Sequence, residues 1–404
     1  MEVQSFSMVV NRVLLDFREK IIVLRTLVKR TAHAALCSLI PGLPDDVVCG
    51  CLARLPRTCW IRLKLVSKGW KRAVEDPFFF QSRANLGVSE EWVYAETWNP
   101  NTKVVSWYAL DVSEGKWLSL PPVPSSTGLD HEVYGRASIS VKGELYVAGG
   151  QAGRSGPTLR DFYIYSPFTH QWRQGRSMIN SRHNALIFVI DDQIYVAGGF
   201  DSSGNLIQEA EKYDVRKKEW FVAGNQGYPK VICPGWYKRG WQLPWSYYTF
   251  DEKEIYLSYF SKDVEHASKP LIKYYASAKE EWFFKPFKDK VKALVTFSLG
   301  ATVNKHIVLV DWATGKLRYT YHPCRSIGWV KVCGLAELDW VTILTSNPKV
   351  VGLGSKLALV GRGLRIWMIE TDPSLVGGKE TFTIIPSRPG AEDEEVVQCV
   401  TLKA

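Results

Sequence analysis

The sequence has 404 residues, of which 46% are hydrophobic and 13% aromatic, and its formal net charge at pH 7 is +10. The length excludes a protein with one small core, and 31 glycines beside this many aromatic residues are typical of a turn-rich β protein. The positive charge is spread along the chain, which favours acidic partners in general and is weak support for nucleic-acid binding, so we expect no nucleic-acid partner.

Cysteine usage indicates a reducing compartment. The cysteines include no Cys-x-x-Cys pair and have no histidine cluster to go with them, so neither a disulfide framework nor a zinc site is expected. We therefore expect free thiols and a location in the cytoplasm, the nucleus or both. The cysteines are Cys37, Cys49, Cys51, Cys59, Cys233, Cys324, Cys333 and Cys399.

Residues 1–38 are predicted to form an N-terminal extension with an amphipathic helix. Within residues 7–30, apolar side chains recur at helical spacing between basic ones. Charges recur too often for a membrane span, and the layout of a signal peptide is missing, so we expect no stable membrane insertion. A mitochondrial presequence is the alternative, against which Asp16 and Glu19 count. We favour a helix that packs on this protein or on a partner.

The next stretch begins with a rigid Leu-Pro entry at residues 43–44. Two aspartates follow at residues 45–46, where the dipole of a starting helix favours negative charge. Val47, Cys51 and Leu55 then recur every four residues, so one face of a short helix is apolar until a proline ends it.

A second helical pattern follows, with Leu63, Val66 and Trp70 at i, i+3 and i+7 between basic residues. Two or three short helices in about forty residues make a core that is barely large enough to be stable alone. The domain predicted over residues 39–84 is therefore expected to bury its surplus apolar face against a partner.

The region predicted over residues 90–404 contains a pattern with a period near fifty residues. Residues 145–150 read Leu-Tyr-Val-Ala-Gly-Gly and residues 194–199 read Ile-Tyr-Val-Ala-Gly-Gly, and each copy is followed by a Tyr-containing strand and a tryptophan, Trp172 or Trp220. A period of this length with strand-like units is typical of a repeat protein.

Each copy predicts a buried strand that ends in a sharp turn, because a run of β-branched and aromatic residues stops at two glycines. Gly149, Gly150, Gly198 and Gly199 allow backbone angles, or a close approach of chains, that a Cβ would forbid. The tryptophan is predicted to pack between neighbouring four-stranded units, since one unit cannot bury its own apolar face. Stacking such units around an axis gives a β-propeller.

Weaker copies extend the pattern to about six units over residues 92–404, with roughly fifty residues in each. The first unit starts without a preceding strand, whereas residues 396–402 form a β-rich run. We predict that this run completes the first unit and closes the ring, which leaves no open sheet edge. The expected fold class is therefore a small all-α domain followed by an all-β propeller of four-stranded blades.

The two patterns resemble known families. The double glycine, the Tyr-Asp strand at residues 213–214 and the spaced Trp resemble the kelch repeat. The helical stretch resembles the F-box at residues 43–46, 51–56, 65–70 and 77–78, although Gly69 departs from the basic residue often seen before the Trp. An F-box joined to kelch repeats resembles a large family of plant substrate receptors.

In that family, the F-box docks on the Skp-type adaptor of a cullin-RING ubiquitin ligase and the propeller holds the substrate. The resemblance implies a substrate-recognition subunit of an SCF (Skp-cullin-F-box) ligase, with the adaptor, a cullin and a protein substrate as partners. Val66 and Trp70 could instead hold the helices together, and residues 43–44 could be a simple helix-entry turn. The adaptor-binding residues that the resemblance implies are Leu43, Pro44, Leu52, Leu55, Leu65, Val66 and Trp70.

Two groups of side chains are candidates for substrate binding. Arg136, Arg182 and His183 precede the innermost strands of two repeats and could line a central channel, although structural bridging of turns is the alternative. A segment within residues 224–248 combines aromatic and basic residues, as interface anchors do, or could be a blade strand whose aromatics pack the interior. Its candidate residues are Trp236, Tyr237, Lys238, Arg239 and Trp241.

Catalytic and metal-binding patterns are missing from the sequence. It has no Gly-x-Ser-x-Gly elbow, no phosphate loop and no His-Glu-x-x-His, and its histidines lack the grouping that a copper oxidase on a kelch propeller would need. We expect no catalytic residue, no metal and no cofactor. The main alternative function is a kelch scaffold that binds actin or a signalling protein, and an enzyme at the channel mouth is a more remote one.

Overall fold

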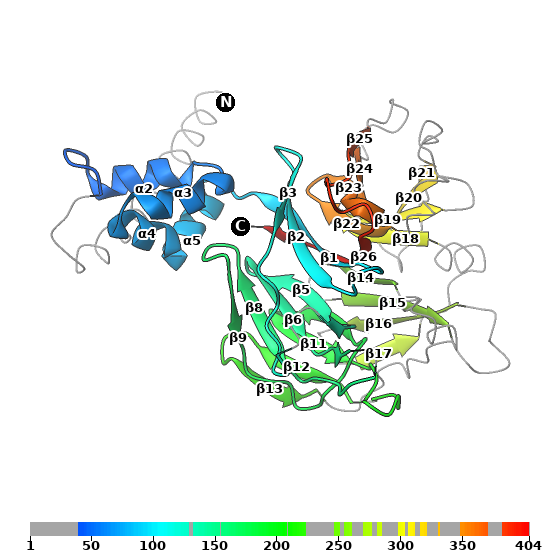
Figure 1. Cartoon of the computed structure of the whole chain (residues 1–404). Helices are drawn as coiled ribbons and strands as arrows, with labels where there is room; N and C mark the ends of the chain where they lie inside the picture. Colours follow the sequence, from blue (N-terminus) through cyan, green and yellow to red (C-terminus); the bar gives the residue numbers. More distant parts are fainter. Residues whose placement is uncertain are drawn as a thin grey trace, which may run out of the picture. The chain divides into compact units, whose positions relative to one another are not determined.

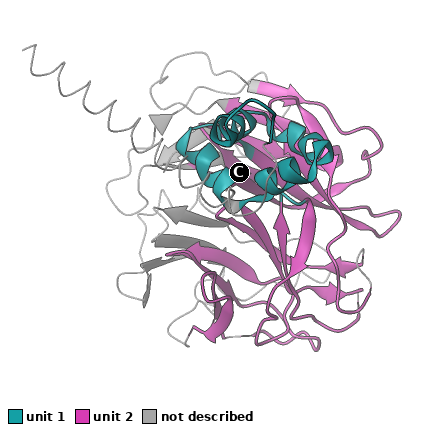
Figure 2. Ribbon diagram, turned by 90° about the vertical axis from the view of Figure 1, so that its left-hand side faces the viewer, with its two compact units in different colours: residues 1–91, 167–169, 403–404 teal, residues 92–166, 170–402 magenta. Residues whose placement is uncertain are grey.

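A computed structural model gives the fold of the chain (Figure 1). It forms two compact units, coloured separately in Figure 2: residues 1–91, 167–169 and 403–404, and residues 92–166 and 170–402. The residues that the structure describes are 39–128, 132–153, 155–207, 209–223, 246–250, 254–260, 270–276, 281–284, 298–303, 306–311, 316–320, 330–331, 348–370 and 382–403.

The first unit is helical (Figure 1). As predicted, Asp45 and Asp46 lie in the first turn of its first described helix. Asp76 caps the last helix, because its carboxylate accepts a hydrogen bond from the Phe78 amide at 2.9 Å. The helices are α2 (Asp45–Ala53), the 3-10 helix η2 (Arg57–Cys59), α3 (Trp60–Val66), α4 (Lys68–Glu75) and α5 (Pro77–Asn85).

The second helical stretch consists of two helices, so the single helix predicted from Leu63, Val66 and Trp70 is wrong. Ser67 has an extended backbone, with φ −161° and ψ 165°, and separates α3 from α4. Its hydroxyl accepts a hydrogen bond from the Trp70 amide at 3.1 Å, which caps α4. A capping serine was the sequence signal for this break, and the continuous apolar spacing around it concealed that signal.

The core of the helical unit contains Trp60, which is buried and meets the ring of Phe79 edge-on with centroids 5.9 Å apart. Val48, Leu52 and Val74 are buried as well. Burial of a side chain of this size stabilises a fold by about 1.5–3 kcal/mol. The small unit therefore depends on a few apolar positions drawn from four helices.

The second unit is built of β-sheets, numbered here along the chain (Figure 1). Within the described residues there are six four-stranded sheets and one two-stranded sheet. Sheet 1 contains β26 (Glu395–Lys403), β1 (Glu91–Trp98), β2 (Val105–Asp111) and β3 (Lys116–Ser119); sheet 2 contains β5 (Ala137–Val141), β6 (Glu144–Ala148), β8 (Phe162–Ser166) and β9 (Gln171–Gln174); sheet 3 contains β10 (Leu186–Ile190), β11 (Gln193–Ala197), β12 (Glu211–Asp214) and β13 (Glu219–Val222).

The remaining sheets follow the same order. Sheet 4 contains β14 (Ser246–Phe250), β15 (Glu254–Phe260), β16 (Pro270–Ala276) and β17 (Glu281–Phe284); sheet 5 contains β18 (Ser298–Val303), β19 (His306–Asp311), β20 (Lys316–Thr320) and β21 (Val330–Lys331); sheet 6 contains β22 (Lys349–Leu353), β23 (Lys356–Val360), β24 (Ile366–Glu370) and β25 (Phe382–Ile385). The two-stranded sheet pairs β4 (Val133–Tyr134) with β7 (Gln151–Ala152), and the 3-10 helix η4 spans Arg362–Leu364.

The strand order agrees with the repeat pattern in the sequence. In sheet 3 the strands pair antiparallel, with Ile194 opposite Tyr213 and Tyr213 opposite Trp220. Sheet 1 has the order β26-β1-β2-β3, so residues 395–403 lie beside β1, as predicted for the β-rich run near the C-terminal end. Six four-stranded sheets are also the number of units that the period predicts.

The repeat tryptophans of sheets 1, 2 and 3 each connect their sheet to another part of the second unit, as their spacing predicts. In three sheets the indole N–H donates a hydrogen bond to a backbone carbonyl outside its own sheet. The bonds are Trp172 to Pro121 at 2.9 Å, Trp220 to Arg176 at 2.7 Å and Trp117 to Leu364 at 2.9 Å. Sheets 2 and 3 also share one apolar cluster, in which the Phe162 ring lies 5.0 Å from Trp220.

The double glycines are required by backbone geometry. Gly149 and Gly150 have φ of 67° and 109°, and Gly198 and Gly199 have φ of 67° and 82°. These left-handed angles strain any residue with a Cβ. A Cβ on Gly149 would also lie only 2.2 Å from the carbonyl oxygen of Arg182. Both predicted reasons for the glycines, unusual angles and close approach, therefore hold at this turn.

Candidate functional site

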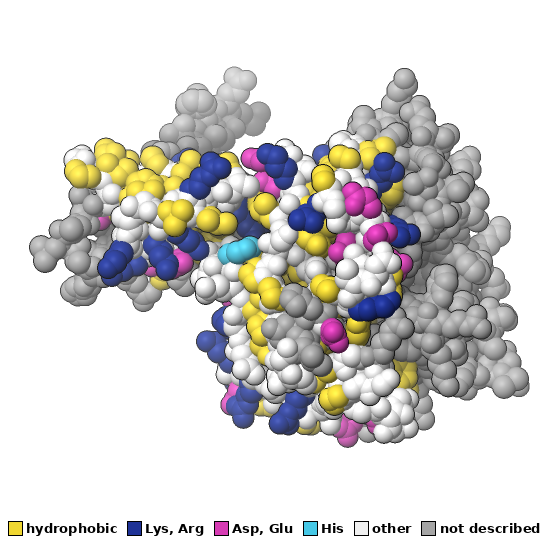
Figure 3. All heavy atoms as spheres, viewed as in Figure 1, with side chains coloured by type: hydrophobic (Ala, Val, Ile, Leu, Met, Phe, Trp, Pro, Cys, Tyr) yellow, Lys and Arg dark blue, Asp and Glu magenta, His cyan; other side chains and the backbone are white. Residues whose placement is uncertain are grey.

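An apolar surface lies on α2, α3 and the segment that enters α2. Large hydrophobic side chains that stay exposed together often mark a protein contact. Figure 3 shows apolar side chains gathered over this side of the helical unit. The apolar surface consists of Leu43, Val47, Ile61, Leu65 and Val66, whose exposed fractions are 47%, 48%, 55%, 82% and 60%.

Helix α2 carries apolar residues on two sides. Val48 and Leu52 are buried and contribute to the core, whereas Val47 and Cys51 are exposed. The face predicted from the spacing of Val47, Cys51 and Leu55 is therefore not the core face. The sequence predicted a surplus apolar face without assigning it to a side of α2, and the exposed side with Val47 and Cys51 is of that kind.

The end of α3 presents the most exposed part of the apolar surface. Leu63 is buried, while Leu65 and Val66 are open to solvent. Because Ser67 ends the helix directly after Val66, these two side chains lie on its last turn. Covering each of them with a partner would remove a large apolar area from water, worth about 1–2 kcal/mol per side chain.

Four of the predicted adaptor-binding residues are exposed. Leu43, Leu65 and Val66 belong to the apolar surface, and Pro44 is exposed at the N-cap of α2. Their position is compatible with direct contact, while their binding role stays a prediction.

The other predicted adaptor-binding residues are less accessible. Leu52 is buried and Leu55 is half-buried. Trp70 is half-buried as well, and its indole N–H donates a hydrogen bond to the Leu39 carbonyl at 2.8 Å. The burial of Leu52 and the hydrogen bond of Trp70 indicate that both side chains help to hold the helical unit together.

Sequence reasoning missed Val47 and Ile61 as members of the apolar surface. Val47 was placed on an apolar helix face but not among the adaptor contacts, because a helix with apolar residues on neighbouring sides gives no sign of which side the core takes. Ile61 follows the buried Trp60 and lacks a distinctive spacing. The available signal for the exposure of Ile61 was that it stands beside a basic residue, Arg62, on a helix.

Cys49 is the thiol of this region whose pKa is shifted. Burial, helped by the charges of Asp45, Asp76 and Asp46, raises the pKa of Cys49 to about 11, so its thiol stays protonated at neutral pH. Among the residues that the structure describes, no group of three or more His, Cys, Asp and Glu could hold a metal ion. None of the described helices has both the length and the apolar content that a bilayer crossing requires.

In the second unit, Arg182 is buried among groups of its own chain. It donates hydrogen bonds to the carbonyls of Gly198 and Glu209, both at 2.9 Å, and to the Glu211 carboxylate at 2.5 Å. The two charged side chains are fully buried, and Glu211 also accepts the amides of residues 179–180. Burial lowers the pKa of Arg182, and Glu211 counteracts this. These contacts bridge turns, which is the alternative to a channel-lining role.

Arg136 and His183 differ in how far their side chains are buried. Arg136 is buried and donates to the Pro124 carbonyl at 3.1 Å, which again ties a loop in place. His183 is half-buried with its ring 5.8 Å from that of Phe200, and burial lowers its pKa, so the imidazole is neutral at pH 7. A substrate contact by any of the three stays a prediction.

The aromatic and basic group predicted to anchor a substrate lies outside the described residues, as does the N-terminal extension of residues 1–38. This group is Trp236, Tyr237, Lys238, Arg239 and Trp241.

Both units match known protein families. The F-box domain matches residues 40–82, which contain the apolar surface, and the Kelch motif matches residues 133–179 and again 181–225, which contain sheets 2 and 3. This chain is an F-box/kelch-repeat protein.

Arabidopsis thaliana contains homologues of this F-box/kelch-repeat chain. The F-box/kelch-repeat protein At1g22040 is 33% identical over 233 residues, which cover 48% of this chain and 48% of that protein. The F-box/kelch-repeat protein At1g67480 is 32% identical over 197 residues, covering 48% and 51%. The F-box protein AFR is 30% identical over 187 residues, covering 46% and 49%. The chain thus spans about half the length of the curated relatives it matches.

Among solved structures, the F-box/kelch-repeat chain is similar to the structure of YjhT. That comparison has a TM-score of 0.46 at 13% sequence identity and covers 69% of this chain and 91% of YjhT.

Proposed function

We propose that this chain is the substrate-recognition subunit of an SCF ubiquitin ligase. The apolar surface would dock on a Skp-type adaptor, and through it on a cullin, while the β-sheet unit holds a protein substrate. The observation that carries the proposal is the exposure of large apolar side chains within the F-box match. The chain would contribute proximity rather than chemistry, because holding two reactants together raises the rate of a transfer performed by other subunits.

The energetics support docking through this surface. The helical unit keeps its apolar surface in water when it is alone, and a partner that covers it gains the hydrophobic free energy of those side chains. Residues such as Leu65 already project from a folded helix, so little conformational entropy is lost when they bind. The proposal assigns the protein to the cytoplasm or nucleus, which imaging of a fluorescent fusion would test.

The first experiment is co-purification of the full chain with a Skp-type adaptor, followed by calorimetric titration. Leu65→Ser should weaken adaptor binding at least about tenfold, because it removes a buried anchor from the interface. Its stability should change by less than about 0.5 kcal/mol, because Leu65 is 82% exposed in the free chain. Leu118→Ser is the matched control, since Leu118 is also exposed but lies in sheet 1.

The outcomes separate the alternatives. If the unmodified chain does not bind the adaptor, the ligase role is wrong and an interaction scaffold without ubiquitin transfer becomes the better account. If the chain binds but Leu65→Ser and a Leu43→Ala/Pro44→Ala double variant bind equally well, the apolar surface is not the docking site.

We also infer that the six sheets close into one propeller. Support comes from Trp117 of sheet 1, which donates to the Leu364 carbonyl between strands of sheet 6, and from an apolar cluster that contains residues of both sheets. Closure would present loops of several sheets on one face of a rigid ring, where substrates of such folds bind. Deletion of residues 395–403 should then lower the melting temperature of the whole β-sheet unit. Unfolding confined to sheet 1 would contradict closure.

A further inference from the structure

Helix α5 ends in a turn that folds the chain back on the helical unit. Gly87 has φ of 67°, and its amide donates to the Ala84 carbonyl at 3.1 Å. The next amide, of Val88, donates to the Arg83 carbonyl at 3.0 Å. This pair of bonds around a left-handed glycine is a Schellman motif, which reverses the chain direction at a helix end. The chain therefore leaves α5 in a defined conformation.

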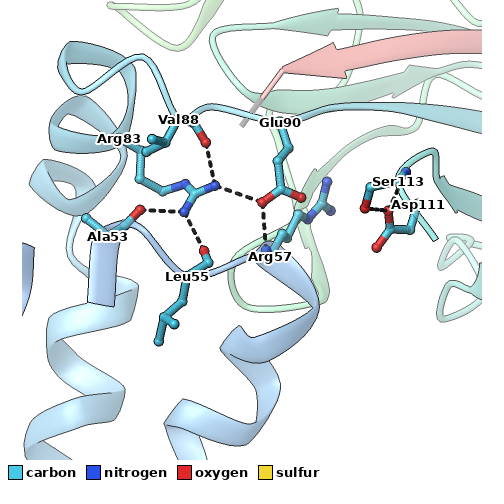
Figure 4. A network of polar contacts seen from close by, with 8 residues as sticks. All are labelled: Ala53, Leu55, Arg57, Arg83, Val88, Glu90, Asp111 and Ser113. Atoms are coloured by element: carbon cyan, nitrogen blue, oxygen red, sulfur yellow. Dashed lines mark hydrogen bonds and ion pairs between the residues drawn. The ribbon is translucent and has the colours of Figure 1, made fainter. Parts of the chain in front are cut away.

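The Arg83 side chain holds the segment that follows this turn (Figure 4). Its Nη1 donates to the carbonyls of Ala53 and Leu55 at 2.6 and 2.7 Å, at the end of α2. Its Nη2 donates to the Val88 carbonyl at 2.7 Å and to the Glu90 carboxylate at 2.9 Å. Arg83 is buried, so these bonds are shielded from water. One guanidinium thus joins α2, α5 and the outgoing chain.

Glu90 has a second partner in the same unit. Its Oε1 also accepts the Arg57 backbone amide at 2.8 Å, at the start of η2. The Arg83 guanidinium also lies 4.9 Å from the centre of the Trp60 ring. The carboxylate is therefore fixed from two sides, by a charged side chain and by the backbone.

The connector between the helical unit and the sheets, residues 86–90, is short and mostly bound. It links the end of α5 to the start of β1 at Glu91, and Gly87, Val88 and Glu90 all bond back to the helical unit. A flexible tether would instead have a solvated, unbonded backbone.

We propose that Arg83 and Glu90 are positioning residues that clamp the connector on the helical unit up to the start of β1. The functional consequence rests on the proposed function. A substrate held by the sheets would be presented to the ligase from a fixed starting point, and ubiquitin transfer would favour a narrow set of lysines.

Hydrogen exchange of the full chain tests the clamp directly. In the unmodified chain, the amides of Arg57 and Val88 should be protected. Glu90→Ala removes charge-assisted hydrogen bonds and should speed exchange in the connector and at Arg57 by about 10- to 100-fold. Glu90→Gln keeps one oxygen acceptor without the charge, so its effect should be smaller. Glu114→Ala is the control, because it breaks the exposed ion pair with Lys116 and should leave the connector unchanged.

A backbone variant tests the same clamp from the helix end. Gly87→Ala strains a left-handed turn whose surroundings leave room for a methyl group, and should speed connector exchange by about 5- to 30-fold. Gly128→Ala carries the same kind of strain, at φ 73° and with open space around it, in a different turn. Connector exchange that stays at the unmodified rate in both Glu90→Ala and Gly87→Ala would overturn the proposal.

The consequence for the ligase is read out by self-ubiquitination, which needs no substrate. In the reconstituted ligase, mass spectrometry should find modification of more lysines of the chain in Glu90→Ala than in the unmodified protein, at unchanged adaptor affinity. The same lysine set in both would refute the positioning role. If the unmodified chain fails to bind the adaptor, the proposed function fails, and hydrogen exchange alone still decides whether the connector is clamped.

Discussion

Glu96 in β1 is a carboxyl group placed almost entirely out of water, with 1% of its surface exposed. Burial raises its pKa to about 7, although the positive charge of Arg136 and a hydrogen bond from Gln398 lower it in part. The Gln398 Nε2 donates to the Glu96 carboxylate at 2.6 Å, from β26 to β1. We expect Glu96→Gln to stabilise the β-sheet unit at alkaline pH, because an amide of the same shape needs no buried charge.

The sign and size of the expected effect on the free energy of unfolding follow from proton binding. In the unfolded chain Glu96 has an ordinary pKa near 4.5, so between pH 4.5 and 7 the folded state holds a proton that the unfolded state has lost. The free energy of unfolding therefore falls as pH rises through this window and levels off above about pH 7. The rise of the Glu96 pKa from 4.5 to about 7 corresponds to a loss in the free energy of unfolding on the order of 3 kcal/mol. Below pH 4.5 the carboxyl is neutral in both states and the cost disappears.

Urea unfolding, followed by tryptophan fluorescence from pH 4.5 to 8.5, measures this contribution as the difference between the two proteins. All other titrating groups are shared and cancel in that difference. The advantage of Glu96→Gln should be near zero at pH 4.5 and reach up to about 3 kcal/mol at pH 8. A variant less stable than the original protein at pH 8, or a difference independent of pH, would refute the reasoning.

Three further sets of substitutions test the second unit by denaturant or thermal unfolding. Arg182→Met should lower the free energy of unfolding by about 3–5 kcal/mol, because it leaves Glu211 charged and buried without its partner. Adding Glu211→Gln should recover part of that loss, and a fully additive double variant would contradict the pairing. Gly149→Ala should cost several kcal/mol more than Gly204→Ala, for which the left-handed φ alone costs about 1–2 kcal/mol, because only the former meets a backbone oxygen. Trp220→Phe should cost at least about 1 kcal/mol for the lost hydrogen bond, and unchanged stability would show that water replaces it.

The repeat elements could be predicted from sequence because their requirements are local. A left-handed φ favours glycine, so the pair Gly149 and Gly150 marks the turn in the bare sequence. The β-branched strands before the glycines and the tryptophans after them likewise occupy fixed places in each unit. These signals predicted about six four-stranded units and placed the β-rich run of residues 396–402 in the first of them.

The functional residues were harder to predict because their roles depend on contacts distant in sequence. Arg182 was a candidate either for lining a channel or for bridging turns, and only the fold shows that its buried partner is Glu211, 29 positions later. Which side of α2 becomes the core is decided by packing, so Val47 and Val48 could not be assigned from spacing. Arg83 could not be found from a motif, because most of its partners are backbone carbonyls, which every residue type has.

The arrangement of sheet 1 affects how the protein is made in the cell. Gln398 and Glu96, which bond across β26 and β1, are separated by 302 positions. A ribosome adds about 5–20 residues per second, so β1 waits about 15–60 s for its neighbour. During that time β1 has an unpaired edge, which can capture strands of other chains. The nascent protein is therefore expected to need chaperone protection until β26 has emerged.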